Sequence, residues 1–179
     1  ALTRKKFLIA KSEAMYGTDP SPVGGSDAIQ VTDLEVTPIE SDNVQSATLQ
    51  GFIGNSTRAT VLANKRVSVS FGVELGGSGT AGTAPAFGPL LKACGLSETT
   101  VADTSVTYAG VSSSFDSATI YCFYDGTRHK VTGCRGTVTF NLTAGQLAVA
   151  NFQFVGIFND PDSTALSGTF TVANQAAAL

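Results

Sequence analysis

The chain has 179 residues, of which 42% are hydrophobic and only 14% are charged, and its formal net charge is −3. Soluble proteins usually carry about 25% charged residues, so the low fraction indicates that partner subunits cover part of the surface. The net negative charge argues against a basic surface that binds nucleic-acid phosphates. No stretch approaches the roughly 20 apolar residues of a membrane helix, and we expect the protein to stay in the compartment where it is made.

The first 27 residues are predicted to form an N-terminal arm, 1–27. They end in the breaker-rich run Gly17-Thr18-Asp19-Pro20-Ser21-Pro22-Val23-Gly24-Gly25 and show no core periodicity. The arm is too apolar for a segment in water, because it carries Phe7, Leu8, Ile9, Met15 and Tyr16. We therefore expect it to pack on its own domain or to dock on a neighbouring subunit.

Residues 28–173 are predicted to form one β domain, because apolar and polar residues then alternate with a period of two. Strands are expected over 29–36 and 43–53, followed by a loop over 54–64. The clearest strand is 66–75. Its apolar positions are Val67, Val69, Phe71, Val73 and Leu75, and its small or polar positions are Ser68, Ser70, Gly72 and Glu74. The two faces of this strand thus differ sharply in polarity.

A helix is predicted over 85–93, where Pro85 suits the first turn and Gly95 can end it. Strands then return on both sides of Asp125-Gly126, a strong hairpin signal that places Cys122 opposite His129. Further strands are expected over 146–158 and 168–172, before a frayed tail, 174–179. The sum is a mainly-β sandwich or barrel with one flanking α-helix.

The run Gly77-Ser78-Gly79-Thr80-Ala81-Gly82 spells the dinucleotide-binding pattern G-x-G-x-x-G. That site requires a preceding strand that is apolar on both faces and a helix that opens directly on the glycines. Strand 66–75 alternates instead, and Thr83-Ala84-Pro85 intervenes before the helix. The sequence therefore predicts a flexible linker here and no nucleotide.

Other chemistry is equally sparse. His129 is the only histidine and falls within a predicted strand, and no G-x-S-x-G elbow is present. Three cysteines, Cys94, Cys122 and Cys134, lack C-x-x-C spacing, so we expect buried reduced thiols and no zinc site. We predict no catalytic residue, no metal and no cofactor, and hence no enzyme.

Several blocks in a fixed order carry a resemblance to a known family. They are Arg4-Lys5, Tyr16 to Pro20, Lys65 to Leu75, Gly77 to Pro85, Phe87 to Gly95, Tyr124-Asp125-Gly126, His129-Lys130, Thr132 to Gly136, Phe140, Ala144-Gly145, Phe152 and Phe154 to Gly156. Together they resemble the major tail tube proteins of long-tailed phages with non-contractile tails. The likeness spans most of Arg4 to Phe158 and departs at Cys134, where a small alanine is expected.

The resemblance implies a virion protein, assembled in the host bacterial cytoplasm, that forms hexameric rings stacked into the tail tube. Neighbouring sheets would join into one barrel around a lumen that holds the tape-measure protein and later passes the genome without binding it specifically. Tail-tip and terminator proteins would be the other partners. Ring closure would also remove exposed sheet edges.

Within this frame, the sequence offers candidates for two kinds of surface. A neutral or acidic lumen lets DNA slide, and the lumen-lining candidates are Ser68, Ser70, Gly72, Glu74, Asp33 and Glu35. The candidates for contact between rings are Arg4, Lys5, Lys6, Phe7, Leu8, Ile9, Met15, Tyr16, Thr57, Arg58 and Leu62. Deleting residues 1–16 is expected to leave a folded subunit that forms no tubes.

Two alternatives remain open at this point. The chain could be a tail terminator or adaptor, which stops at a single ring, or another β-sandwich binding module of the virion. An adhesin should expose aromatic side chains in its binding loops. The sequence has no tryptophan, which disfavours an adhesin.

Overall fold

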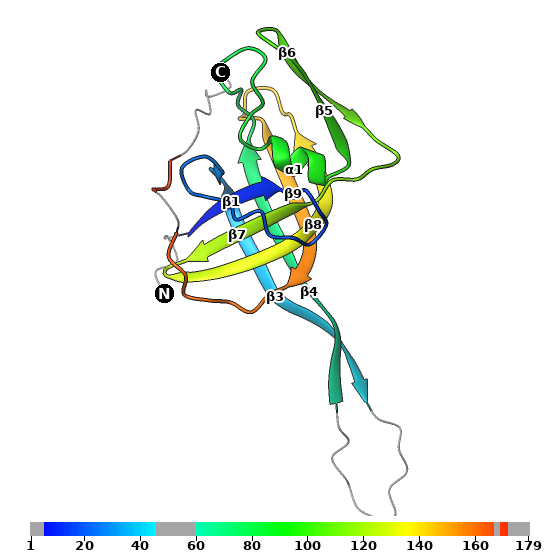
Figure 1. Ribbon diagram of the computed structural model, residues 1–179. Coiled ribbons are helices and arrows are strands. Elements are labelled where there is room, and N and C mark those ends of the chain that lie inside the picture. Colours follow the sequence, from blue (N-terminus) through cyan, green and yellow to red (C-terminus); the bar gives the residue numbers. More distant parts are fainter. Residues whose placement is uncertain (1–5, 46–59, 167–168, 172–179) are drawn as a thin grey trace, which may run out of the picture.

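The structure is a computed structural model that describes residues 6–45, 60–166 and 169–171. Within these ranges it is mainly β with one short helix, as predicted (Figure 1). The elements are β1 Lys6–Ser12, β2 Ala28–Ile29, β3 Thr32–Gln45, β4 Thr60–Glu74, α1 Gly88–Ala93, β5 Leu96–Val101, β6 Ser105–Gly110, β7 Ala118–Tyr124, β8 Thr127–Asn141 and β9 Val149–Phe158.

Seven of the described strands form one antiparallel sheet in the order β2-β1-β7-β8-β9-β4-β3, and β5 and β6 form a separate hairpin. The sheet folds over on itself, so that β1 and β7 cross β3 and β4 at a steep angle in Figure 1. The long strand β8 joins the two halves, because it pairs with β7 and with β9. Register shifts near Gly133, whose φ is +62°, bend β8 between its two partners.

The main core lies between the two halves of the folded sheet. Phe71, Phe152 and Phe154 stack there with ring centroids 5.6–5.9 Å apart. The helix α1 closes one end of this core through Leu90 and Leu91, both of which are buried. The core is therefore built from the apolar positions of β4 and β9 and from the apolar stripe that the sequence predicts for the helix.

A smaller cluster covers the other face of β1 and β7. Phe7 stacks on Phe123 at 4.6 Å and also meets Phe170 at 5.0 Å. Leu166 packs against the same cluster, and the N–H of Thr171 donates to the carbonyl of Gly24. Segments from the two ends of the chain thus pack together over the sheet.

The structure changes the prediction for the N-terminal arm. Residues 6–12 form strand β1, which lies between β2 and β7 and pairs along its whole length with β7. Leu8 and Ile9 are buried within the subunit. The arm therefore packs on its own domain over this stretch, the first of the two expectations, because its apolar side chains complete both clusters.

Other elements also differ from the sequence prediction. Strand β4 begins at Thr60, so 60–64 is strand where a loop was expected. The helix is shorter, since its first turn begins only at Gly88. The β5–β6 hairpin was missed, and 169–171 is not a strand. The predicted hairpin of β7 and β8 is confirmed, with Cys122 opposite His129.

Cys122 and Cys134 are buried free thiols, as predicted, and Cys94 is half-buried. Burial raises the pKa of both Cys122 and Cys94 to about 12, so the thiolate form is disfavoured at neutral pH. Among the described residues, no helix is long and apolar enough to span a bilayer.

Candidate assembly surfaces

A polar face runs across four strands of the sheet, opposite the main core. Residues that pair directly share a face, and the pairings align Glu35 with Ser70, Ser70 with Gln153, and Gln153 with Thr137. A neighbouring row begins with Thr37 and Ser68. We call this surface the polar face. Its rows are Glu74, Val149 and Asn141; Thr32, Gly72, Asn151 and Thr139; Glu35, Ser70, Gln153 and Thr137; and Thr37, Ser68, Val155 and Arg135.

The structure brings most of the predicted lumen residues together on this polar face. Ser68, Ser70, Glu74 and Glu35 lie on it, and both glutamates are exposed. Gly72 lies in the same face but is buried. A Cβ at Gly72 would come within 2.6 Å of the Thr32 hydroxyl, so its neighbours cover it.

Asp33 and Glu40 complete the acidic groups near this face. Asp33 is exposed and sits at a register shift of β3 with φ +50°. Glu40 accepts hydrogen bonds from Ser68 Oγ at 2.7 Å and Arg66 Nε at 3.1 Å. These hydrogen bonds lower the pKa of Glu40, which keeps it ionised and paired with Arg66 beside the predicted lumen residues.

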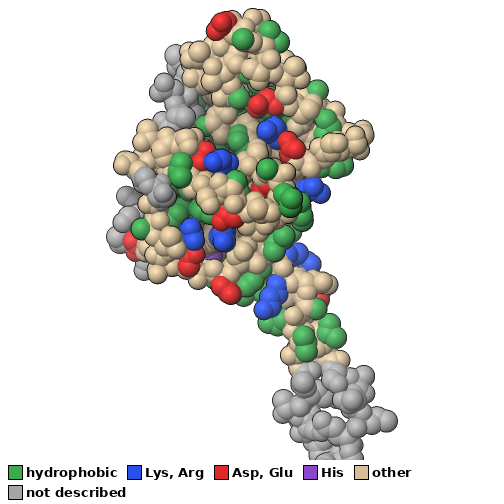
Figure 2. All heavy atoms as spheres, in the orientation of Figure 1, with side chains coloured by type: hydrophobic (Ala, Val, Ile, Leu, Met, Phe, Trp, Pro, Cys, Tyr) green, Lys and Arg blue, Asp and Glu red, His purple; other side chains and the backbone are tan. Residues whose placement is uncertain are grey.

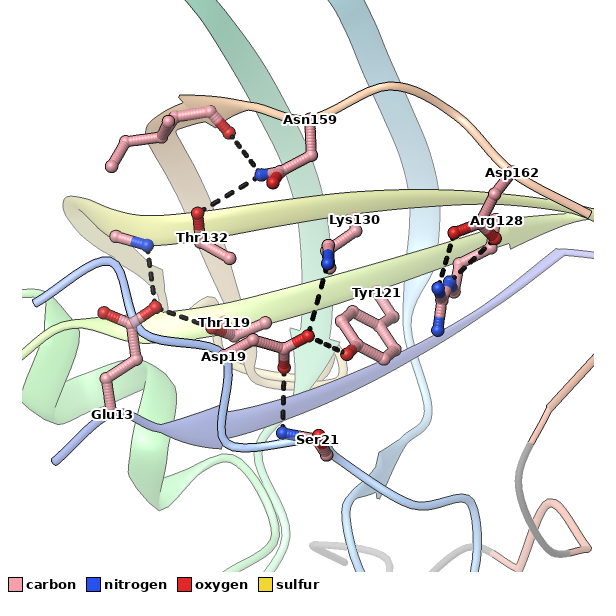
Figure 3. Close-up of polar contacts among 12 residues, drawn as sticks. Glu13, Asp19, Ser21, Thr119, Tyr121, Arg128, Lys130, Thr132, Asn159 and Asp162 are labelled. Atoms are coloured by element: carbon pink, nitrogen blue, oxygen red, sulfur yellow. Dashed lines mark hydrogen bonds and ion pairs between the residues drawn. The ribbon is translucent and has the colours of Figure 1, made fainter. Parts of the chain in front are cut away.

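A half-buried carboxylate fastens the segment after β1 to the sheet. Glu13 accepts hydrogen bonds from Ser117 Oγ and Thr119 Oγ1, both at 2.6 Å, and from the N–H groups of Gly133 at 2.7 Å and Gly17 at 2.8 Å. Burial alone would raise the pKa of Glu13, but the four hydrogen bonds outweigh it and hold the pKa below 4.5. Glu13 therefore ties residues 13–17 to β7 and β8 (Figure 3).

A second set of contacts holds the flanking loops on the same hairpin. Asp19 accepts from the Tyr121 hydroxyl and from the N–H of Ser21, and its carboxylate lies 3.5 Å from Lys130 Nζ. Arg128 donates two hydrogen bonds to Asp162, whose pKa falls to about 2 for that reason. Figure 3 shows these carboxylates gathered along β7 and β8.

Replacing Glu13 with Gln is expected to destabilise the fold by about 2 kcal/mol, because an amide group would face four donors with one acceptor oxygen. The folded-state pKa of Glu13 is depressed, so its contribution is complete above the unfolded pKa and is lost as the pH falls below about 4.5. Urea unfolding at pH 7 and at pH 3 checks this, and Glu13→Gln should show the smaller loss between the two. Glu74→Gln, an exposed control, should change stability by less than about 0.5 kcal/mol; equal losses in both variants would contradict the assignment.

A two-stranded ribbon projects from the body of the subunit (Figure 1). Before Arg66, β4 pairs only with β3, and the described pairs end at Gln45 and Thr60. We call residues 41–45 and 60–65 the ribbon. Its side chains Val44, Val61 and Leu62 are 54%, 63% and 49% exposed. Figure 2 shows hydrophobic side chains on this projection.

A groove lies near the end of β4 opposite the ribbon, with a cavity volume of about 800 Å³. The glycine-rich loop 76–83, the helix α1, the β5–β6 hairpin and the end of β8 enclose it. We call it the glycine-loop groove. It is lined by Leu75, Gly76, Gly77, Ser78, Gly79, Thr80, Ala81, Gly82, Thr83, Pro85, Phe87, Leu91, Leu96, Thr104, Ser105, Val106, Tyr108 and Phe140.

The glycine-rich loop does not open a helix. Gly82 has φ +69°, and a Cβ there would lie 2.4 Å from the N atom of Asp103 and 2.6 Å from the carbonyl oxygen of Val101. This glycine is needed for close contact with the β5–β6 turn. The groove lining contains no Lys or Arg, which a pyrophosphate site would favour.

The residues predicted for contact between rings occupy different environments. Leu8 and Ile9 are buried in the subunit and are unavailable for contact with another copy, whereas Phe7 is half-buried against Phe123. Lys6 lies over the Tyr124 ring, and Tyr16 lies under the Arg135 guanidinium at 4.8 Å. Exposed positions are Lys6, Met15, Tyr16 and Leu62, and Arg4, Lys5, Thr57 and Arg58 lie outside the described residues.

His129, the single histidine of the sequence, lies in β8. His129 packs edge-on against Tyr124 at 5.6 Å, and burial lowers its pKa. Within the described ranges, no group of three or more His, Cys, Asp or Glu side chains could hold a metal ion. The described residues thus present three distinct surfaces, which are the polar face, the ribbon and the uncharged glycine-loop groove.

Comparison with known proteins places the chain in a family. Residues 3–179 match the model of the phage tail tube protein family, and the chain belongs to that family. The family groups structural components of the tail tube, not enzymes. No curated protein sequence matches the chain.

Two solved structures are similar to the chain. One is the anti-feeding prophage cap, a tube-terminating cap, with 9% identity, a TM-score of 0.49 and 88% of each chain covered. The other belongs to the sheath–tube complex of an extracellular contractile injection system in its extended state, with 10% identity, a TM-score of 0.43 and 88% of each chain covered.

Proposed function

We propose that this protein forms hexameric rings that stack into the tail tube of a phage with a non-contractile tail and provide the conduit for genome delivery. The observation that carries the proposal is the match of residues 3–179 to the tail tube family. Six-fold symmetry and the non-contractile tail type rest on the sequence resemblance. In this proposal the tube assembles in the host cytoplasm around the tape-measure protein and ends at tip and terminator proteins.

The polar face is the proposed lining of the lumen. Its exposed residues are mainly Thr, Asn and Gln, with the acidic groups Glu35 and Glu74 at one part of the face and Val155 and Arg135 in its last row. Short polar side chains leave a bore open, and carboxylates repel the DNA phosphates, so the genome slides without stalling. Ser70 would face the lumen beside Glu35, and Ser68 would face it one row further from Glu74.

Contacts between rings are proposed for the exposed members of the predicted set. Lys6, Met15 and Tyr16 lie at or after β1, and Leu62 lies on the ribbon. The first sixteen residues thus have two roles, because Leu8 and Ile9 build the core while their exposed neighbours remain available to a second ring.

Negative-stain electron microscopy of the purified chain, dilute and then concentrated, tests the proposal. We expect stacked rings or long tubes with a central hole. Single closed rings that never stack would favour the terminator or adaptor. A chain that stays a monomer or a compact dimer at every concentration would overturn the tube assignment.

Reversing the charge of the polar face should make the tube bind DNA. The double variant Glu35→Lys, Glu74→Lys alters two exposed side chains and is expected to keep the fold. Short duplex DNA should bind variant tubes at 50 mM salt and dissociate by about 200 mM salt, because each new lysine adds a phosphate contact. Wild-type tubes should bind none.

The matched control for this binding assay is Asp160→Lys, which changes an exposed carboxylate in the loop after β9. DNA that binds the control tubes as tightly as the double variant would refute the assignment of the polar face to the lumen.

A further inference from the structure

Two aliphatic side chains are exposed at the edge of the polar face. Val155 pairs with Ser68 of β4 and with Arg135 of β8, in the last row of that face. Ile157 lies two residues further along β9 and pairs with Arg66. Val155 is 47% exposed and Ile157 is 42% exposed. Because residues two apart on a strand share a face, both side chains point to the same side of the sheet as the polar face.

Tyr16 lies beside these two side chains. A Cβ at Gly133 would come within 3.0 Å of the Tyr16 ring and 3.1 Å of Ile157 Cδ1, so the two side chains meet over this glycine. The Arg135 guanidinium lies 4.8 Å from the centre of the Tyr16 ring. We call Tyr16, Arg135, Val155 and Ile157 the platform.

The platform is held in place within the free subunit. The Glu13 carboxylate accepts hydrogen bonds from the N–H groups of Gly133 at 2.7 Å and Gly17 at 2.8 Å. These two bonds fix the segment that carries Tyr16 against β8. A partner would therefore meet an aromatic ring that is already ordered, which lowers the entropic cost of binding.

Arg135 gives the platform a positive charge. Its side chain is exposed, and the ion pairs found among the described residues do not include it. One guanidinium N–H donates to the carbonyl of Phe115 at 3.0 Å, whereas a guanidinium has five N–H donors. Arg66 differs, because Glu40 already pairs with it at 3.1 Å. The platform is thus suited to a ligand that carries a carboxylate.

DNA and an acidic polypeptide both carry negative charge, and the platform favours the polypeptide. Duplex DNA presents phosphates and gains little from contact with Val155 and Ile157, and the carboxylates Glu35 and Glu74 on the same face repel it. A polypeptide with apolar and acidic side chains satisfies both parts of the platform. Tyrosine and arginine are also enriched among the residues that dominate protein–protein contacts.

We propose that the platform binds an acidic amphipathic polypeptide that occupies the lumen of the tube. The inference rests on the proposed function, because it takes the polar face as the lumen lining. Each platform offers a small contact, so one site should bind weakly. Stacked rings would repeat the site, and many weak contacts along one chain give tight overall binding through effective concentration.

Fluorescence anisotropy of a labelled peptide with the purified chain tests the platform. The probe is a synthetic helix of about four heptads, with leucine at the a and d positions and glutamate at the flanking positions. We expect a Kd on the order of 0.1 mM. Arg135→Glu and Ile157→Ser should each weaken binding by about fivefold or more. Both positions are exposed, so the fold should be kept.

Each variant has a matched control. Lys6→Glu reverses an exposed cation that also lies over a tyrosine ring, 4.9 Å from the centre of Tyr124. Val101→Ser removes an exposed aliphatic side chain of β5. Both controls should bind the peptide as the wild-type chain does. If Lys6→Glu weakens binding as much as Arg135→Glu, the peptide responds to net charge alone and the inference is overturned.

Two further probes separate a polypeptide from a polyanion. A peptide with serine in place of the leucines should bind more weakly than the acidic helix, and short duplex DNA should not displace the helix. Equal binding of the serine peptide, or displacement by DNA, would make Arg135 a contact for negative charge alone and would overturn the inference.

Assembly in the presence of the acidic peptide tests where the platform lies. The peptide should sediment with wild-type tubes, and less of it with Arg135→Glu tubes. Tubes that exclude the peptide overturn the inference and leave the tube function standing; this result would also arise if a second ring covered Tyr16. A chain that forms no ring or tube, yet binds the peptide through Arg135 and Ile157, overturns the proposed function and the lumen placement but keeps the binding surface.

Discussion

A chain that lacks residues 1–16 is expected to lose its cooperative fold. The deletion removes β1 from between β2 and β7, together with Leu8 and Ile9, which are 0% and 1% exposed. Burying one such side chain contributes about 1.5–3 kcal/mol, and the ladder with β7 and the contacts of Glu13 are lost as well. The total approaches the roughly 5–15 kcal/mol by which a typical domain is stable. This reverses the outcome that the sequence alone suggests.

Thermal unfolding followed by circular dichroism distinguishes the two outcomes. A control chain that lacks only residues 1–5 keeps β1 whole and should melt in one transition near that of the full chain. The chain without residues 1–16 should show no cooperative transition and should be digested rapidly by proteases. A cooperative melt within a few degrees of the full chain would show that β1 is dispensable.

Replacing Gly136 with Ala is expected to destabilise the subunit by about 3 kcal/mol or more, near the upper end for an overpacked core. A Cβ at this position would lie 2.0 Å from the carbonyl oxygen of Gln153 and 2.7 Å from the Phe154 ring. The first of these atoms is backbone of β9, so it cannot move aside without breaking the β8–β9 ladder.

Urea unfolding measures this loss. Gly110→Ala is the matched control, because a Cβ there has no neighbour within 4 Å; its stability should change by less than about 0.5 kcal/mol. A midpoint for Gly136→Ala equal to that of Gly110→Ala would mean that β8 and β9 are less closely packed than described.

The sequence predicted those elements in which local pattern and burial agree. Strand β4 alternates strictly over 66–74, and its apolar positions Val67, Val69, Phe71 and Val73 are buried. The Asp125-Gly126 signal set the register of β7 and β8, because a two-residue turn fixes which residues face each other. The glycine-rich run lies in the loop between β4 and α1, and Thr83-Ala84-Pro85 separates it from the helix, as the sequence indicates.

The remaining features depend on contacts between distant segments. The sequence predicts an arm over residues 6–12 because a glycine- and proline-rich run follows them. The strand they form pairs with 118–124, more than a hundred residues further on, and local sequence does not reveal that pairing. The role of Glu13 requires Ser117, Thr119 and Gly133 to meet at one carboxylate, which no local spacing reveals. The β5–β6 hairpin was missed because its strands are mostly polar and half-exposed, so their hydrophobic pattern is weak.

The irregular pairing of β3 also affects how the subunit behaves before assembly. Strand β3 forms one end of the sheet, and three register shifts and Pro38 interrupt its pairing with β4. A long flat edge is a template for indiscriminate strand addition, and bulges and proline are the features that prevent it. The interruptions therefore disfavour indiscriminate pairing of β3 with other chains, so that unassembled copies resist amyloid-like aggregation.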